Sequence, residues 1–211
     1  MNNKINFIIS ELKKNYEVAD CALEYQDEPY KLLILARLSA QCTDARVNIV
    51  AQTLFQEFKS LEDFADADLE KLERAIFSCG LYKMKARNIK DMCKMLVDKY
   101  DSKVPEDMAE LLKLPGIGRK IANLIRGDIF KLPAIVADTH CIRISNRLGL
   151  CDSENPVKVE KQLLEVIPAE ESNDFCHRLV FFGREYCKSQ NPRCGECFLA
   201  GACNFKESVR S

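Results

Sequence analysis

The chain has 211 residues, of which 47% are hydrophobic and 30% charged, and its net charge at pH 7 is −1. This composition is typical of a globular protein, and the length allows one large domain or two small ones. The longest uncharged apolar run beyond the N-terminus, Leu32–Ala36, is far too short to cross a bilayer, and the apolar run at the start is too short for a signal peptide. We therefore expect no membrane partner and a cytoplasmic location.

Apolar residues recur at positions i, i+3, i+4 and i+7 along most of the chain, which predicts α-helices. The predicted helices are, in chain order, Ile5–Leu12, Val47–Phe58 with Thr43 or Asp44 as N-cap, Ile89–Tyr100, Pro105–Leu112, Ile121–Ile129 after Gly118, Thr139–Leu148, Pro156–Ile167 and Ser172–Tyr186. Pro105 fits the first turn of its helix, which must end before Pro115. Only Ala134–Val136 is expected to be extended, and it is too short for a sheet. The predicted fold class is all-α.

Four of the eleven cysteines have the spacing C-x6-C-x2-C-x5-C near the C-terminus: Cys187, Cys194, Cys197 and Cys203. Thiolates bind iron–sulfur clusters or zinc strongly, and either would hold such a tight loop together. A zinc ribbon usually has two C-x2-C pairs, whereas this segment has one. The spacing therefore favours one [4Fe–4S] cluster, with zinc as the alternative.

Basic residues are concentrated in the middle of the chain. Residues 117–147 contain six Lys or Arg residues and two Asp residues, while acidic residues gather elsewhere. A nearly neutral protein with its charges sorted in this way can present one basic face to phosphate. Ordinary solvated helix faces explain the same pattern equally well.

The segment Leu114–Gly118, with the sequence LPGIG, separates two predicted helices. Its two glycines allow a sharp, partly left-handed turn that a Cβ would obstruct. The backbone N–H groups at the start of the next helix would then point outward, which makes a site for an anion such as a DNA phosphate. Many helical hairpins need glycine, so the turn by itself is weak evidence.

Lys120 follows in the first turn of that helix, where the helix dipole and partial burial would lower its pKa. A lysine with free amine can act as a Schiff-base-forming nucleophile. Asp138 opens a later helix and fits either an N-cap, a role open to Thr139 as well, or a carboxylate that stabilises positive charge and assists proton transfer. Lys120 and Asp138 are therefore the candidate catalytic pair.

The three motifs LPGIGRK, ADTH-x-x-R-x-x-NRLG and C-x6-C-x2-C-x5-C occur in this order. Together they resemble the endonuclease III family, the iron–sulfur DNA glycosylases of the helix-hairpin-helix superfamily, over essentially the whole chain. The resemblance implies a two-domain helix-hairpin-helix glycosylase fold. Residues 22–132 would form a six-helix bundle, and residues 1–21 and 133–211 would form the iron–sulfur cluster domain.

The resemblance also implies a bifunctional base-excision-repair enzyme that acts, as a monomer, on damaged double-stranded DNA. A damaged base must leave the duplex to be reached, and Gln41 would fill the gap while Leu81 enters the opposite strand. Lys120 would displace an oxidised pyrimidine, and β-elimination would cut 3′ to the abasic site. DNA contacts are expected from Gln41, Leu81, Leu114, Gly116, Gly118 and Arg119, and from Lys188 and Arg193 on the cysteine loop. The location would then be cytoplasmic and nucleoid-associated if the source is bacterial.

Several alternatives stay open at this point. Monofunctional iron–sulfur glycosylases lack the lysine found here at Lys120, a DNA-binding module would not need Lys120 with Asp138, and an electron carrier explains only the cysteines. Ile121, Arg126 and Ala137 depart from what is usual in the family. These departures leave the catalytic pair intact, so they concern the range of substrates and not the type of reaction.

Overall fold

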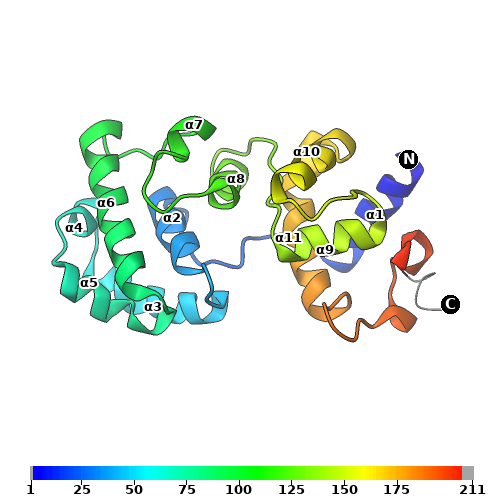
Figure 1. The fold of residues 1–211 in the computed structure, drawn as a ribbon, viewed down its shortest axis with the longest axis horizontal. Coiled ribbons are helices and arrows are strands. Elements are labelled where there is room, and N and C mark those ends of the chain that lie inside the picture. The colour runs from blue at the N-terminus through cyan, green and yellow to red at the C-terminus, as the bar shows by residue number, and fades with distance from the viewer. Residues whose placement is uncertain (1, 206–211) are drawn as a thin grey trace. The chain divides into compact units, whose positions relative to one another are not determined.

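The computed structural model describes residues 2–205. Their regular elements are all helices, with no β-strand among them (Figure 1). The α-helices are α1 (Asn2–Asn15), α2 (Pro29–Leu38), α3 (Asp44–Glu57), α4 (Leu61–Ala65), α5 (Leu69–Ala75), α6 (Tyr82–Tyr100), α7 (Met108–Leu111), α8 (Arg119–Asp128), α9 (Thr139–Leu148), α10 (Pro156–Val166) and α11 (Ser172–Glu185). Four 3-10 turns accompany them: η1 (Phe77–Cys79), η2 (Ala169–Glu171), η3 (Cys194–Glu196) and η4 (Ala200–Ala202). The prediction of an all-α protein is confirmed.

One predicted helix begins later than expected. Pro105 lies outside α7, which begins at Met108 because the Asp107 side chain accepts hydrogen bonds from the backbone N–H groups of Ala109 and Glu110. Aspartate is a strongly preferred N-cap residue, because its carboxylate accepts hydrogen bonds from the first free backbone N–H groups of the helix. The helix therefore shrinks to four residues.

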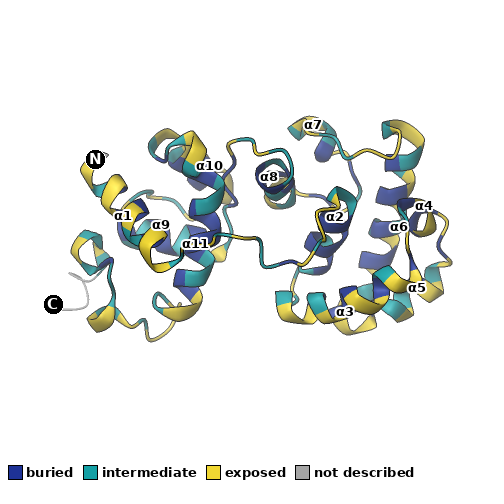
Figure 2. Ribbon diagram, turned by 180° about the vertical axis from the view of Figure 1, so that it is seen from behind, coloured by how far each residue is buried: buried dark blue, intermediate teal, exposed yellow. Residues whose placement is uncertain are grey.

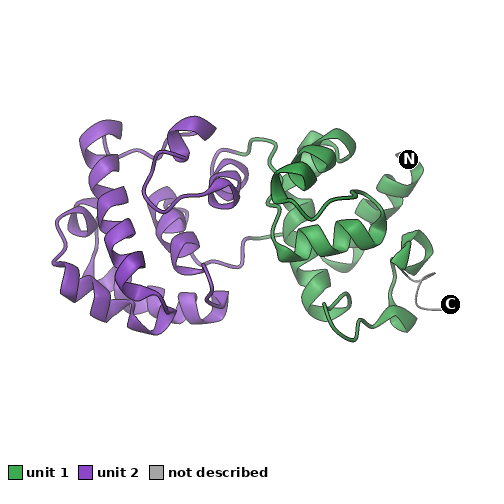
Figure 3. Ribbon diagram, in the orientation of Figure 1, with its two compact units in different colours: residues 1–20, 131–211 green, residues 21–130 purple. Residues whose placement is uncertain are grey.

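The chain forms two compact units, shown in Figure 3. Unit 2 is continuous and comprises residues 21–130, and unit 1 combines residues 1–20 with residues 131–211. Unit 2 holds α2 to α8, of which α4 and α7 are the shortest.

The core of unit 2 is built mainly on α2 and α6. Residues 31–36 of α2 are all buried, and an apolar helix of this kind must lie inside its bundle (Figure 2). α6 presents Ile89, Met92 and Leu96 to the core, as its i, i+3, i+7 pattern predicts. Side-chain caps start α3, α4, α5 and α7, and Thr43 before α3 is one of the two N-caps expected there.

In unit 1 the N-terminal helix lies against the last long helix. Ile8 and Leu12 of α1 are fully buried where α1 packs on α11. The Arg178 Nε of α11 also donates to the Tyr16 carbonyl at 3.0 Å, which fixes the end of α1. No helix among the described residues is long and apolar enough to cross a membrane.

The extended segment Ala134–Val136 belongs to no sheet, as predicted. Its backbone N–H groups bond to side chains of α11: Ala134 donates to Ser172 Oγ at 3.1 Å, and Val136 donates to Cys176 Sγ at 3.3 Å. Buried backbone donors need partners, and α11 supplies them here in place of a neighbouring strand. This anchoring fixes the chain just before Asp138.

Candidate functional site

The hairpin between α7 and α8 is tight and closely supported from within unit 2. Gly116 has φ +79, and a Cβ there would lie 2.7 Å from Arg37 Nε and 2.9 Å from Asn88 Cβ. Arg37 of α2 donates to Asn88 Oδ1 of α6 from Nε at 3.2 Å and from Nη2 at 2.9 Å. The turn therefore rests on a polar pair that leaves room for glycine alone.

The turn is left-handed at Gly116 and not at Gly118, which agrees with the partly left-handed turn expected. Gly118 has φ −102, which any residue adopts, and no atom lies within 4 Å of the position a Cβ would take. It is the N-cap of α8 and makes no side-chain cap. The missing side chain therefore serves to keep the first turn of α8 open, which suits close approach of an anion to its backbone N–H groups.

Lys120 and Arg119 occupy the first turn of α8, and both are exposed. The partial burial expected for Lys120 is thus wrong, because this turn of the helix faces away from the core of unit 2. Leu114 is only 2% exposed. A DNA contact at Leu114 would therefore have to use its backbone, whereas Arg119 offers its side chain.

Asp138 is the N-cap of α9, and its Oδ1 accepts a hydrogen bond from the Cys141 backbone N–H at 2.7 Å. Of the two caps expected, the structure uses Asp138 and not Thr139. The cap holds the carboxylate in one orientation, so the structural and the catalytic reading of Asp138 are compatible. Lys120 belongs to unit 2 and Asp138 to unit 1.

Gln41 and Leu81 share an unusual backbone conformation. Gln41 has φ +56 between α2 and α3, and Leu81 has φ +47 just before α6. Both are exposed, Leu81 by 51%. Residues other than glycine rarely adopt this left-handed region of φ and ψ. Where they do, the backbone strain is often linked to function. An exposed leucine on a strained tip is not a core residue.

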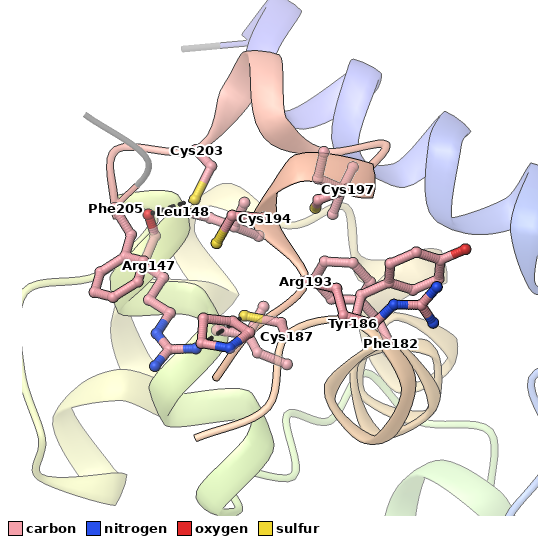
Figure 4. Close-up of a pocket in the computed structure, with 13 residues that line it drawn as sticks. Arg147, Leu148, Phe182, Tyr186, Cys187, Arg193, Cys194, Cys197, Cys203 and Phe205 are labelled. Carbon is pink, nitrogen blue, oxygen red and sulfur yellow. Dashed lines mark hydrogen bonds between the residues drawn. The ribbon is translucent and has the colours of Figure 1, made fainter. Parts of the chain in front are cut away.

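The four cysteines of the C-terminal loop line one pocket, with their sulfur atoms visible in Figure 4. Aromatic rings of Phe182, Tyr186 and Phe205 also line it. Burial raises the pKa of the Cys197 thiol, and the other three cysteine sulfurs add to this shift. Four thiols in a partly apolar pocket are a donor set that suits iron, which stabilises the thiolate forms.

Two arginines of α9 hold the start of this loop, a role the sequence analysis missed. Arg143 donates to the Cys187 carbonyl from Nε at 3.2 Å and Nη2 at 2.9 Å. Arg147 donates to the carbonyls of Lys188 at 2.7 Å and Ser189 at 3.1 Å. It also donates to Cys187 Sγ at 3.3 Å (Figure 4). Their i, i+4 spacing in the ADTH motif was the available signal. These arginines thus support the loop from within unit 1.

The two basic residues predicted to meet phosphate lie on the surface of the loop. Lys188 and Arg193 are exposed. Arg193 forms an ion pair with Glu196 and lies over the Tyr186 ring, 5.1 Å from its centroid. A phosphate at Arg193 would therefore compete with Glu196.

Two family models match the chain. Residues 34–169 match the HhH-GPD superfamily of base excision DNA repair proteins. Residues 187–203, which begin and end at cysteines, match the iron–sulfur binding domain of endonuclease III. The prediction of a [4Fe–4S] cluster is confirmed, and zinc is set aside.

Curated relatives and solved structures agree with these matches. The chain is 45% identical over 201 residues to endonuclease III of Bacillus subtilis (strain 168), covering 95% of this chain and 91% of the relative. It is 37% identical over 202 residues to endonuclease III of Escherichia coli (strain K12), covering 96% and 95%. A solved trapped endonuclease III–DNA covalent intermediate matches with a TM-score of 0.93 and 44% identity, covering 100% of this chain and 99% of that one.

Proposed function

This chain belongs to the endonuclease III family of base-excision DNA repair glycosylases, and we propose that it is bifunctional, with both glycosylase and lyase activity. It removes oxidised pyrimidines from duplex DNA and then cuts the strand 3′ to the abasic site. The observation that carries this proposal is an exposed Lys120 in the first turn of α8, directly after the hairpin. A lysine offered to the substrate in this way can form a Schiff base.

In the first step, the Lys120 Nζ lone pair forms a bond to the sugar C1′ as the bond from C1′ to the base breaks. The base leaves with the electron pair of the broken bond to C1′ and takes up a proton. The Asp138 carboxylate stabilises the positive charge on the sugar and accepts a proton from the attacking amine. Its capping bond to the Cys141 N–H fixes the orientation of the carboxylate on α9.

In the second step, opening of the sugar ring gives a Schiff base between Lys120 and C1′. The imine draws electrons from the neighbouring carbon and makes its C2′ proton acidic. Loss of this proton expels the 3′ phosphate as the C3′–O bond breaks. Hydrolysis of the imine then releases Lys120 for another round.

DNA is held by the hairpin and opened by two strained tips. The open start of α8 at Gly118 receives a backbone phosphate, with Arg119 beside it. Gln41 fills the space left by the flipped nucleotide, and Leu81 enters the opposite strand. Both side chains are exposed, as insertion requires.

The cluster has a structural role in this proposal. Cys187, Cys194, Cys197 and Cys203 hold it, and when bound it fixes a loop that carries Lys188 and Arg193 to DNA phosphates. No step of the reaction needs an electron. The protein acts as a monomer on damaged duplex DNA in the cytoplasm.

Borohydride trapping on a duplex with a single thymine glycol tests the proposal. We expect a covalent protein–DNA adduct with the native protein, none with Lys120→Gln, and a full yield with the control Lys94→Gln, an exposed lysine of α6. Base loss seen only after alkali would show a monofunctional glycosylase. If the protein binds duplexes with this and other oxidised pyrimidines but gives neither adduct nor base loss, it is a non-catalytic DNA-binding module.

A further inference from the structure

The two strained tips of unit 2, the turns that carry Gln41 and Leu81, follow directly on the ends of helical elements. Gln41 and Leu81 are exposed at positive φ, and such conformations persist only when the surrounding structure holds them. The turn that carries Gln41 follows α2, which ends at Leu38. The turn that carries Leu81 follows η1, which ends at Cys79. Whatever fixes these two ends also fixes the tips.

Lys85 of α6 bonds to both ends. Its side chain is fully buried, and its Nζ donates to the Leu38 carbonyl at 2.8 Å and to the Cys79 carbonyl at 2.6 Å. The last carbonyls of a helix have no partner within the helix, and a cation is favourable beside them. One ammonium group therefore joins the bases of the two tips.

Burying a lysine in a core costs free energy, because its ammonium group loses its contact with water. Its neighbours on α6, Ala86 and Ile89, are buried and apolar, so an apolar residue would suit the packing at this position. Burial lowers the pKa of Lys85, and the nearby Cys42 and Cys79 sulfurs oppose part of that shift. In some proteins a buried polar or ionised group is retained because it specifies one arrangement of the groups around it.

We propose that Lys85 is a positioning residue for DNA opening, which holds Gln41 and Leu81 at a fixed separation and acts only through them. The inference rests on the proposed function, in which these two side chains enter the duplex. Lys85 itself is buried and does not touch DNA. The Arg37–Asn88 pair, on the same two helices, supports the hairpin under Gly116, so α2 and α6 carry all three DNA-contacting turns of this unit.

The test compares Lys85→Met with Lys90→Met in the cluster-loaded protein. Lys90 lies on the same helix and its Nζ also donates to a backbone carbonyl, that of Ala67 at 2.6 Å, far along the chain from both tips. The readout is the single-turnover rate of base release from a thymine glycol duplex. We expect Lys85→Met to slow it by about tenfold or more and Lys90→Met by less than about threefold. Equal rates in the two variants would overturn the inference.

A double-mutant cycle separates positioning from general destabilisation. In a Gln41→Ala, Leu81→Ala background, Lys85→Met should change the rate by less than about threefold, because the tips it supports are gone. An undiminished effect in that background would contradict the proposal. If Lys85→Met does not fold, Lys85→Arg replaces it in the same cycle, with the same criterion, because its larger head separates the two carbonyls while keeping the charge.

The native protein distinguishes this inference from the function on which it rests. No base release by native protein would refute the proposed function. Normal release by native protein, with no difference between Lys85→Met and Lys90→Met, would refute the role of Lys85 alone.

Discussion

In unit 2, residues 31–36 of α2 are buried on all sides, whereas the segment Cys187–Phe205 of unit 1 buries only Leu199. The bundle has a continuous apolar core that extends from Leu23 to Ile125. The cysteine loop has two 3-10 turns, η3 and η4, and depends on bonds from Arg143 and Arg147. Burial of apolar surface is the main source of stability in a domain, and this loop has little of it.

The difference shows how one chain orders two regions by different means. In unit 2 the helices fix the tips and the hairpin through buried apolar side chains and the hydrogen bonds of Lys85 and Arg37. In unit 1 the proposed role of the cluster is to hold the loop in place, since four metal–thiolate bonds would replace the missing core. Removing a ligand should therefore affect unit 1 far more than unit 2, and the following changes test this contrast.

The largest expected effect is that of Cys197→Ser. Loss of a ligand should release the iron, unfold the loop, weaken DNA binding and lower the Tm by roughly 10 °C or more, since several kcal/mol are lost. Iron content, visible absorbance and calorimetry measure this. Cys151→Ser, at a half-buried cysteine of unit 1 outside the loop, is the control and should keep its iron. A folded, iron-free Cys197→Ser protein with full activity would contradict a structural role for the cluster.

Gly116→Ala should be the most damaging single change in the hairpin. The left-handed backbone costs about 1–2 kcal/mol for alanine, and the contacts with Arg37 and Asn88 add about 1–3 kcal/mol. Gly118→Ala meets no atom and should cost less than about 1 kcal/mol. Urea unfolding measures both.

Gly116→Ala and Gly118→Ala should also differ in their effect on DNA affinity. Gly118→Ala should weaken binding to duplex DNA although it is the milder change for stability, because its Cβ occupies the space before the first N–H groups of α8. Unchanged affinity in Gly118→Ala would argue against a phosphate at this position.

Asp138→Ala should destabilise unit 1 by about 1 kcal/mol through loss of the N-cap on α9. Asp138→Asn keeps a capping oxygen and should cost little stability. Both variants should lose most base-excision activity, because neither supplies a carboxylate. Thermal unfolding and single-turnover kinetics together separate the two roles, and an active Asp138→Asn enzyme would reduce Asp138 to a cap.

The smallest effect is expected on the surface of unit 2. Hydrogen bonds from Lys113 and Tyr100 lower the pKa of the partly exposed Glu110 carboxyl. A lowered pKa stabilises the folded state above the carboxyl's unfolded pKa, and this contribution is lost as the pH falls through the folded pKa. The stability difference between native protein and Glu110→Gln should therefore shrink from about pH 7 to about pH 3. A difference that does not change with pH would refute this assignment.

Much of the fold could be predicted from local patterns. The prediction for α9 is the same as the observed Thr139–Leu148, and α10 and α11 each end one residue earlier than predicted. Such patterns report the face that a helix buries, which each segment encodes by itself. The start of α7 was predicted wrongly, because the choice between Pro105 and Asp107 depends on which cap the folded chain forms.

The sequence by itself determined that the protein is all-α, that four cysteines share one loop, and that Lys120 follows a glycine hairpin, because each of these is a pattern of neighbouring residues. Only the tertiary structure decided which side chains support them. The exposure of Lys120, the open space at Gly118, the bonds of Arg143 and Arg147 to the cysteine loop, and the burial of Lys85 between two carbonyls all depend on helices distant in sequence. Contacts of this kind form when whole helices pack, so no local pattern records them.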